Sequence, residues 1–322
     1  MARCLVTGVA GFIGSHLAEA LLEAGWLVRG VDNLSTGQPE NLELLHDVGR
    51  CNFEFIRGDI RSQVICERAS KDVEVVYHLA ALGSVPRSVI DPATTHDHNA
   101  TGTLNMLHGA AKNGVKCFVY SSSSSVYGDT EELPKHEDMT PRPVSPYAVS
   151  KLAGEMYCQA FWRTYSFPTI ALRYFNVYGP RQSPHGPYAA VIPRWAEAML
   201  GGKETPLFGD GQQTRDFTYV KDVVAANLRA GRARVGTMDE RSFGKAFNAG
   251  RGSPVSLREL HKLMADRLDY SAAPSLEPAR TGDVRDSWAE IKRLFIHLEH
   301  EPQWGLEEGL DETLEWYRRK HG

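Results

Sequence analysis

The glycine-rich turn G-V-A-G-F-I-G near the N-terminus constrains the fold of this chain more than any other stretch. An apolar run at residues 2–7 precedes the turn and predicts a buried strand. A helix is expected over about residues 12–23, followed by a second strand over 27–31 that Asp32 ends. This order of strand, glycine turn, helix, strand and acid within about 30 residues is typical of a βαβ unit that binds a dinucleotide.

Each glycine of the turn has a physical role in such a unit. Gly8 permits the tight turn, Gly11 lets backbone N–H groups approach a pyrophosphate at the helix N-terminus, and Gly14 lets the helix pack on the strand. The Asp32 carboxylate can accept hydrogen bonds from both ribose hydroxyls, and its negative charge would repel a 2′-phosphate. The sequence therefore favours NAD over NADP as cofactor.

A second chemical feature lies in the middle of the chain. The apolar run at 115–120 predicts a buried strand, and a block of five serines follows it. Ser145 suits a helix N-cap and Pro146 suits the first turn, so a helix is expected to start there. Tyr147 and Lys151 then share one helix face, and a nearby positive charge favours the phenolate. Tyr147 is therefore a candidate general base, although Y-x-x-x-K also occurs by chance on solvated helices.

Further strands are expected at 53–57 and 73–79. Asp59, after the third strand, is either a ligand of the adenine amino group or a plain turn aspartate. Small residues after the fourth strand would let the backbone approach a cofactor. The loop at 83–88 is expected at the carboxyl end of that strand, where open α/β sheets bind ligands.

Strands that alternate with helices predict an α/β fold with a doubly wound parallel (Rossmann) sheet. Later in the chain glycine, proline and aromatic residues become more frequent and the alternation fades. We expect an NAD-binding Rossmann domain over 1–176, which also receives about 215–250. The remainder, 177–322, is expected to form mainly a smaller, discontinuous substrate-binding region.

Composition excludes several function classes. The 322 residues carry a formal net charge of −4 with both signs interspersed, which is unlike a nucleic-acid footprint. The five cysteines are scattered without a C-x-x-C pair, so free thiols in a reducing cytoplasm are expected. No signal peptide is predicted at the N-terminus, and no apolar run is long enough to span a membrane. No metal site is predicted, because His96 and His98 alternate on a helix and do not face each other.

The motifs of the chain resemble, in their order, those of the extended short-chain dehydrogenase/reductase family. Within it the chain is most similar to NAD-dependent nucleotide-sugar epimerases and dehydratases, especially UDP-N-acetylglucosamine/UDP-glucose 4-epimerases. The matching residues are Gly8, Gly11 and Gly14; Asp32; Asp59-Ile60; the serine block with Val126-Tyr127-Gly128; Tyr147 and Lys151; Arg173 to Arg181; Arg215-Asp216-Phe217; and Gly282-Asp283-Val284.

The resemblance implies a reaction in three parts. Tyr147, as phenolate, takes the proton of the sugar 4-hydroxyl, and Ser123 bonds the same oxygen and relays the proton. Lys151 lowers the tyrosine pKa and holds the nicotinamide ribose. The 4-hydride passes to NAD+, and the resulting 4-keto sugar turns over and takes the hydride back on its other face.

The resemblance also implies two sets of binding residues. The cofactor set is Gly8, Gly11, Phe12, Ile13, Gly14, Asp32, Asn33, Asp59, Ile60, Leu79, Ala80, Ala81, Asn99, Tyr147, Lys151 and Tyr174. The UDP-sugar set is Ser84, Arg87, Ser123, Ser124, Ser125, Asn176, Ala190, Val191, Arg215, Arg280, Asp283 and Ser287. Arg215 and Arg280 would bind the pyrophosphate from two sides. Asp283 would accept a hydrogen bond from a hydroxyl of the uridine ribose.

Two positions narrow the activity. Related 4,6-dehydratases carry Asp-Glu where this chain has Ser124 and Ser125, and serine cannot protonate a leaving hydroxyl, which favours epimerisation. Ser287 is small where plain-hexose enzymes often carry a bulky aromatic residue, which leaves room for a 2-acetamido group. UDP-glucuronate 4-epimerase remains an alternative, in which Arg87 or Arg181 would donate hydrogen bonds to the sugar carboxylate. Another nucleotide-sugar oxidoreductase or dehydratase and a non-enzymatic NAD sensor also remain alternatives.

A homodimer is also implied by the resemblance. The expected interface consists of the helix that carries Tyr147 and a long helix over about residues 92–113. The apolar side chains offered for it are Leu104, Leu107, Leu152, Met156 and Phe161.

Overall fold

The computed structural model describes residues 2–186, 189–232, 240–278 and 284–321. Its centre is a seven-stranded parallel sheet in the order β11-β6-β5-β4-β1-β2-β3. The strands are β1 (Arg3–Thr7), β2 (Leu27–Asp32), β3 (Phe53–Arg57), β4 (Val75–His78), β5 (Cys117–Ser123), β6 (Thr169–Tyr174) and β11 (Lys245–Ala249). The predicted doubly wound parallel sheet is therefore confirmed.

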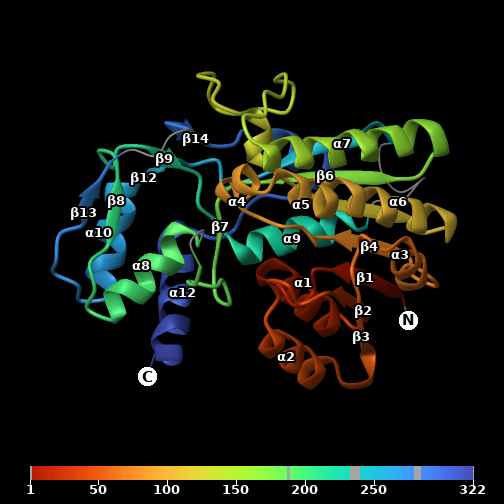
Figure 1. Ribbon diagram of the computed structural model, residues 1–322, viewed down its shortest axis with the longest axis horizontal. Helices are drawn as coiled ribbons and strands as arrows, with labels where there is room; N and C mark the ends of the chain where they lie inside the picture. The colour runs from red at the N-terminus through yellow and green to blue at the C-terminus, as the bar shows by residue number, and fades with distance from the viewer. Residues whose placement is uncertain (1, 187–188, 233–239, 279–283, 322) are drawn as a thin grey trace.

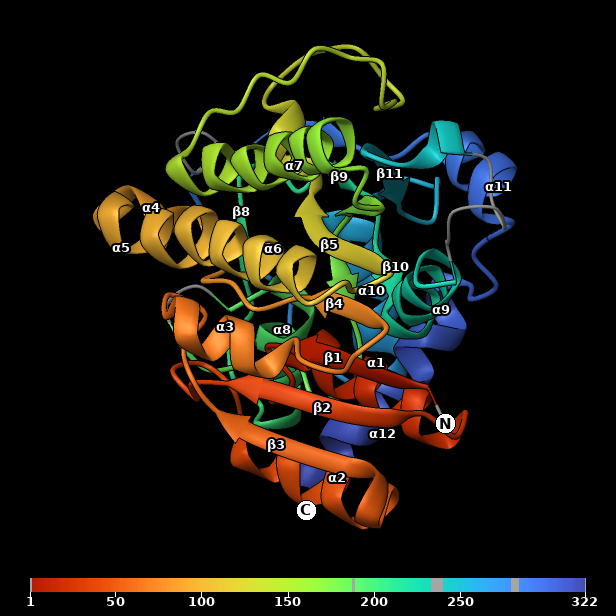
Figure 2. The ribbon, with the colours of Figure 1, turned by 90° about the vertical axis from the view of Figure 1, so that its right-hand side faces the viewer.

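Helices cover both faces of this sheet (Figures 1 and 2). On one face lie α1 (Phe12–Glu23), α2 (Pro39–Gly49) and α9 (Val220–Ala230), and on the other α3 (Gln63–Ala69), α6 (Gly102–Lys112) and α7 (Pro146–Tyr165). Neighbouring residues of β1 show why both faces are needed, because Val6 packs into one buried apolar cluster and Leu5 into the other. Strands buried on both faces read as continuous apolar runs in the sequence.

The predicted glycine turn connects β1 to α1. Gly8 has φ +69°, and its N–H donates to the carbonyl of Val31 at 2.8 Å. A Cβ on Gly14 would lie 2.1 Å from the Gly8 carbonyl oxygen, so only glycine lets α1 pack this closely on the turn. The helix start predicted at Ser145 is also confirmed, since the Ser145 hydroxyl accepts the N–H of Ala148 at 3.2 Å.

Two local predictions were wrong. The expected continuous helix over 92–113 consists of α5 (Pro92–His96), a π-helical turn η2 (Asp97–Thr101) and α6. The expected loop at 83–88 contains the short helix α4 (Val85–Ile90). Side-chain caps explain α4 and α5, because Ser84 accepts the N–H of Arg87 and Asp91 accepts the N–H of Thr94.

The later part of the chain forms a smaller region to one side of the sheet (Figure 1). Its helices are α8 (Val191–Leu200), α10 (Leu257–Arg267) and α12 (Leu306–His321), whereas α11 (Lys292–Leu298) packs against β11 of the main sheet and against α9. Its short strands, in three small sheets, are β7 (Val177–Tyr178), β8 (Pro206–Phe208), β9 (Thr214–Arg215), β10 (Thr218–Tyr219), β12 (Val255–Ser256), β13 (Ser275–Glu277) and β14 (Asp286–Ser287). The 3₁₀ turns are η1 (Arg50–Asn52), η3 (Ser124–Tyr127) and η4 (Glu240–Ser242). None of the described helices has the length and apolar character needed to cross a membrane.

Helix α7 lies unusually close to strand β5. A Cβ on Gly154 would come within 2.3 Å of the ring carbon Cζ and the hydroxyl of Tyr120. Tyr120 cannot move aside easily, because it is buried in the core and its hydroxyl donates to the carbonyl of Lys151 at 3.3 Å. The absence of a side chain at Gly154 therefore sets the distance between this helix and the sheet.

We predict that Gly154→Ala lowers the free energy of unfolding by about 1–2 kcal/mol, because overpacking costs more than the roughly 1 kcal/mol that alanine gains as a helix former. Urea denaturation measures the change. Gly83→Ala is the matched control, since a Cβ there meets no atom within 4 Å. Equal stability of the two variants would show that α7 does not depend on this contact.

Candidate active site

A pocket opens at the carboxyl end of the main sheet, between β1 and β4, where the order of the strands reverses. Open α/β sheets bind nucleotides at such switch points. We call it the sheet-edge pocket. Its lining is Gly8, Gly11, Val31, Asp32, Asn33, Ser35, Thr36, Gly58, Ile60, Leu79, Ala80, Ala81, Leu82 and His98.

The residues of the sheet-edge pocket fit a dinucleotide. Helix α1 begins after Gly11 without a side-chain cap, so its first N–H groups are available to a pyrophosphate. The Asp32 carboxylate is fixed at the end of β2 by the N–H groups of Ala10 (3.0 Å) and Leu34 (2.8 Å). Burial raises the pKa of Asp32, and these backbone hydrogen bonds oppose the shift. The predicted ribose acceptor is therefore held in place before any ligand arrives.

Asp59 is engaged within its own turn and does not line the pocket. Its carboxylate accepts from Asn33 Nδ2 at 3.0 Å and from Arg61 Nη2 at 2.8 Å. The hydrogen bonds from Arg61 hold the pKa of Asp59 well below its usual range. Ile60 and His98 face the pocket instead. His98 was not anticipated as a pocket residue, because its position on the π-helical turn is not visible in the sequence.

Asn99 supports the pocket from behind. Its side chain is buried, accepts the N–H of Leu82 at 2.7 Å, and donates to the Leu82 carbonyl and to Ser150 Oγ. Thr7 Oγ1 likewise accepts the N–H groups of Leu79 and Ala80, both at 3.1 Å. These bonds fix the backbone after β4 that lines the pocket.

Tyr147 and Lys151 share one face of α7, as predicted, and the structure shows that this face contacts β5. The Lys151 ammonium is buried, donates to the Ser121 carbonyl at 2.8 Å, and lies 6.0 Å from the centroid of the Tyr147 ring. Burial lowers the pKa of Lys151 to about 8, while the Glu155 carboxylate opposes that shift. Lys151 is thus held by the end of the strand that carries the serine block.

In the protein by itself the net shift of the Tyr147 pKa is upward, which differs from the lowered value that the resemblance implied. Burial raises the pKa of the Tyr147 phenol, and a hydrogen bond with Ser123 works in the opposite direction. The cost of burying a phenolate outweighs the favourable neighbour. Ser123 and Tyr147 are nevertheless brought together, so both could reach one sugar oxygen.

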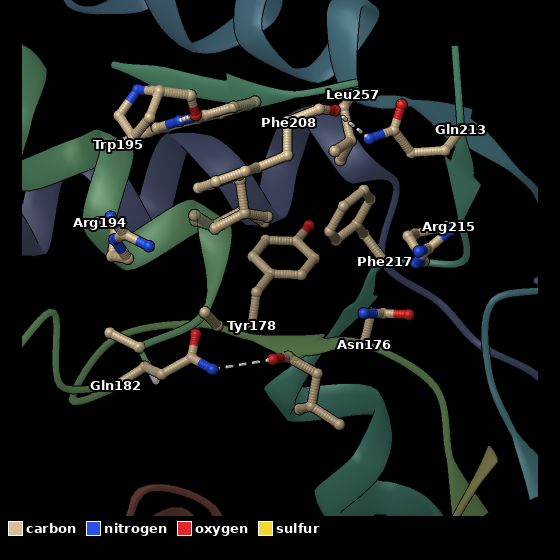
Figure 3. Close-up of a pocket in the computed structure, with 16 residues that line it drawn as sticks. Asn176, Tyr178, Gln182, Arg194, Trp195, Phe208, Gln213, Arg215, Phe217 and Leu257 are labelled. Atoms are coloured by element: carbon tan, nitrogen blue, oxygen red, sulfur yellow. Dashed lines mark hydrogen bonds between the residues drawn. The ribbon is translucent and has the colours of Figure 1, made fainter. Parts of the chain in front are cut away.

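A second, larger pocket lies beside α8, and we call it the α8 pocket (Figure 3). Its volume is about 270 Å³. Its lining is Asn176, Val177, Tyr178, Gln182, Ala189, Ala190, Val191, Ile192, Arg194, Trp195, Pro206, Phe208, Gln213, Arg215, Phe217 and Leu257. Ser123 pairs with Tyr174 in the β5–β6 register, and Asn176, which lines the α8 pocket, follows Tyr174 by two residues, so this pocket lies near the end of β5.

The α8 pocket combines positive charge with aromatic surface. Helix α8 begins at Val191 without a side-chain cap, and Arg194 and Arg215 line the same space. Uncapped N–H groups and guanidinium groups together suit a phosphate. Phe208 and Phe217 supply flat apolar faces between them (Figure 3).

Four predicted substrate residues line the α8 pocket: Asn176, Ala190, Val191 and Arg215. Arg194, Phe208 and Gln213 also line this pocket, and the sequence did not indicate them as site residues because they come from separate segments. Arg280 and Asp283 lie outside the described residues.

The remaining predicted substrate residues lie outside this lining. Ser287 pairs with Arg215 across the β14–β9 ladder and is therefore next to the α8 pocket. Ser84 uses its hydroxyl to cap α4, on which Arg87 lies. Ser124 and Ser125 form the start of η3, and the buried Ser125 hydroxyl has no hydrogen-bond partner within the described part of the chain.

Arg181 is committed to the protein itself. Its guanidinium donates to His16 Nδ1 at 2.8 Å and forms an ion pair with Glu19, both on α1. His16 in turn donates through Nε2 to the Pro180 carbonyl at 2.9 Å, and burial lowers the pKa of His16 to about 3, so the ring is neutral. The suggestion that Arg181 binds a sugar carboxylate is therefore not supported by its contacts.

Among the described residues no cluster of three or more His, Cys, Asp or Glu side chains has the arrangement of a metal site. The groups that meet beside the end of β5 are instead the Tyr147 phenol, the Lys151 ammonium and the Ser123 hydroxyl, and the α8 pocket adds the guanidinium groups of Arg194 and Arg215. Such a set can transfer a proton and bind nucleotides.

Comparison with known proteins gives a consistent result. Residues 4–250 match the family described as "NAD dependent epimerase/dehydratase family". A UDP-glucose 4-epimerase of Mycolicibacterium smegmatis is 42% identical over 99% of both chains. The structure of a UDP-N-acetylglucosamine 4-epimerase from Methanobrevibacter ruminantium, in complex with UDP-N-acetylmuramic acid, is similar with a TM-score of 0.92, 35% identity and 99% of each chain covered. A UDP-glucuronic acid 4-epimerase from Bacillus cereus, in complex with UDP-glucuronic acid and NAD, has a TM-score of 0.87, 32% identity and the same coverage.

We predict that Asp32→Asn lowers the ratio of the Kd for NADP to the Kd for NAD by at least about tenfold, because the carboxylate repels a 2′-phosphate and its loss removes that repulsion. Calorimetric titration of the cofactor-stripped protein with both dinucleotides measures the ratio. Asp47→Asn, on the exposed face of α2, is the control. An unchanged ratio in Asp32→Asn would show that another group selects the cofactor.

Proposed function

Because this chain belongs to the NAD dependent epimerase/dehydratase family, we propose that it is an NAD-dependent nucleotide-sugar 4-epimerase. It interconverts UDP-N-acetylglucosamine with UDP-N-acetylgalactosamine, UDP-glucose with UDP-galactose, or both, through a 4-keto intermediate. The observation that carries this proposal is the meeting of Tyr147, Lys151 and Ser123 at the edge of the sheet that also forms the dinucleotide pocket.

Tyr147 is the proton acceptor and later the proton donor at the sugar 4-oxygen. Ser123 bonds the same oxygen and stabilises the phenolate, while the Lys151 ammonium supplies positive charge within reach of the phenol. When bound, NAD supplies the hydride acceptor and further positive charge. That charge matters here, because burial alone raises the pKa of Tyr147.

The cofactor is held by the sheet-edge pocket and the UDP group by the α8 pocket. The N-terminus of α1 and Asp32 bind the pyrophosphate and a ribose of the cofactor. The N-terminus of α8, with Arg194 and Arg215, binds the substrate pyrophosphate, and Phe208 supports the uracil ring. The sugar then extends from the α8 pocket towards Ser123.

The serine block favours epimerisation over dehydration. Dehydration requires an acid to protonate the leaving hydroxyl, and Ser124 and Ser125 occupy the positions after the proposed relay. A second candidate, UDP-glucuronate 4-epimerase, is supported by the similarity to the Bacillus cereus structure. It would rely on Arg87, since Arg181 is bound to Glu19 and His16.

We propose that residues 1–176 together with about 215–250 form the cofactor-binding domain. After the chain has left the main sheet, α9 packs against it and β11 becomes its edge strand. Residues 177–322 otherwise form the substrate region. The five free cysteines, of which only Cys51 is exposed, support a cytoplasmic location.

We also propose a homodimer that uses α7 and the neighbouring α4. Apolar side chains are exposed there, with Val89 at 64%, Ile90 at 74%, Val149 at 49% and Met156 at 48%. Of the side chains suggested from the sequence, Leu107 and Phe161 are buried in the protein's own core and cannot form the interface. Sedimentation velocity at micromolar concentration should show a dimer, and a monomer would contradict this proposal.

The proposed function is tested by incubating the purified protein with UDP-glucose, UDP-N-acetylglucosamine and UDP-glucuronate and resolving the epimers by chromatography. We expect 4-epimers of one or both of the first two sugars without added NAD. Conversion of UDP-glucuronate alone would select the second candidate. A 4-keto-6-deoxy product would indicate a dehydratase instead.

We predict that Tyr147→Phe lowers kcat by about 10²–10⁴-fold, because the variant loses general acid–base catalysis at the 4-oxygen. Steady-state kinetics with the best substrate measures the loss, and circular dichroism checks the fold. Tyr157→Phe, on the same helix and partly exposed, is the control and should retain full turnover. Near-normal kcat in Tyr147→Phe would mean that another group accepts the proton.

We predict that Ser287→Tyr reduces the ratio of kcat/KM for UDP-N-acetylglucosamine to that for UDP-glucose by about 10- to 100-fold. Ser287 lies beside Arg215, and a tyrosine ring would occupy the space that a 2-acetamido group needs. Overpacking costs about 1–3 kcal/mol, and each 1.36 kcal/mol is about tenfold in rate. If Ser287 is only a turn residue, both substrates are affected equally and the ratio does not move.

A further inference from the structure

A buried ion pair lies directly behind the serine block. Arg173 on β6 donates through Nε to Glu155 Oε1 at 2.9 Å and through Nη2 to Oε2 at 2.7 Å. Both side chains are only 4% exposed. Buried ion pairs lose much of their attraction to the cost of desolvation, and apolar pairs of similar volume often stabilise a protein equally well. Stability by itself is therefore a weak explanation for this pair.

The pair is connected to the residues that handle the proton. Ser122 Oγ donates to Glu155 Oε1 at 2.5 Å, and Ser122 stands opposite Arg173 in the β5–β6 register. Ser123 is the next residue along β5. Lys151 lies one helical turn before Glu155 on the same face of α7. Glu155 thus joins the helix that carries the base to the strand that carries the relay.

Arg173 continues the network on its other side. Its guanidinium lies over the ring of Tyr127, 4.8 Å from the centroid, and the Tyr127 hydroxyl donates to Asn248 Oδ1 at 2.6 Å. The amide of Asn248 donates to the Glu290 carbonyl at 3.1 Å, three residues beyond Ser287. The network therefore connects α7, β5, β6, η3 and β11 to the segment that passes the α8 pocket.

We propose that Glu155 and Arg173 are positioning residues for the epimerisation. Their ion pair holds the end of β5 in register with α7, so that Ser123 stays at the distance from Tyr147 that proton transfer requires. The inference rests on the proposed function. A displacement of about 1 Å at a reacting group can cost about 100-fold in rate, so a small loss of register is visible in kcat.

The charge of Glu155 supports the same role. Burial lowers the pKa of Lys151 to about 8, and the Glu155 carboxylate acts against this shift. The other titratable groups recorded near the Lys151 ammonium are the phenols of Tyr147 and Tyr120 and the ring of His78. Burial lowers the pKa of His78 to about 3, so that ring is neutral. Glu155 therefore helps Lys151 to remain charged as well as in place.

The direct test is the double variant Glu155→Leu/Arg173→Met, which replaces the pair by apolar side chains. We expect bound NAD content, thermal midpoint and KM close to wild type and a kcat lower by about 10- to 100-fold. Arg173→Lys is a milder second variant, which keeps the charge but cannot form the two-pronged contact. We expect its kcat to lie between those of wild type and the double variant.

Arg29→Met is the matched control. Arg29 is also a largely buried arginine on a strand, and it pairs with Glu54 at 2.8 Å on β3, on the far half of the sheet. Its loss should lower the thermal midpoint and leave kcat unchanged.

Wild-type kcat in the double variant would overturn the inference. If that variant does not fold, Arg173→Lys decides, since a wild-type kcat there overturns the inference and a lower kcat with unchanged KM and thermal midpoint supports it. Wild-type protein that epimerises none of the UDP-sugars counts against the proposed function itself, which separates the two failures.

Discussion

The packing of α7 against β5 is the contact on which the rest of this site depends. Gly154 brings the helix against Tyr120, whose hydroxyl binds the helix backbone at Lys151. The Lys151 ammonium then reaches the Ser121 carbonyl. Because side chains are fixed on both elements, this one distance determines whether Tyr147 meets Ser123. The Glu155–Arg173 pair acts on the same contact further along the helix.

The two pockets depend on a second connection, between α1 and the chain that leaves the sheet after β6. His16 and Glu19 on α1 bind Pro180 and Arg181, and the Tyr317 hydroxyl of α12 donates to the Gln182 carbonyl. The helix whose N-terminus suits the cofactor is thereby tied to the segment that lines the α8 pocket. The proposed cofactor and substrate sites are thus parts of one packed structure, which suits a reaction in which a hydride leaves and returns.

Local sequence rules predicted the parts of the fold that depend on local physics. The glycine turn, Asp32 and the capped helix start at Ser145 each follow from backbone conformation or hydrogen bonding within a few residues. The break in the helix expected over 92–113 did not follow, because the π-helical turn holds Asn99, whose side chain bonds distant residues. No local pattern reports such a tertiary contact.

The site was predicted unevenly for the same reason. Asn176, Ala190, Val191 and Arg215 were proposed from their motifs and line the α8 pocket. Arg194, Phe208 and Gln213 reach the same pocket from separate segments. The net direction of the Tyr147 pKa shift in the protein by itself also differed from the expectation, because it depends on how deeply the folded chain buries the phenol. Sequence spacing gives the neighbours of a group, and only the fold gives its desolvation.

The central claim is that a hydride leaves the sugar C4 and returns to the same carbon within one closed site. The most direct measurement uses UDP-glucose carrying deuterium at C4, with the products analysed by mass spectrometry and NMR. The account predicts that the 4-epimer retains the deuterium at C4, with no exchange into water and no transfer to an unlabelled sugar in the same mixture. Loss of the deuterium to solvent, or its appearance on another molecule, would contradict it.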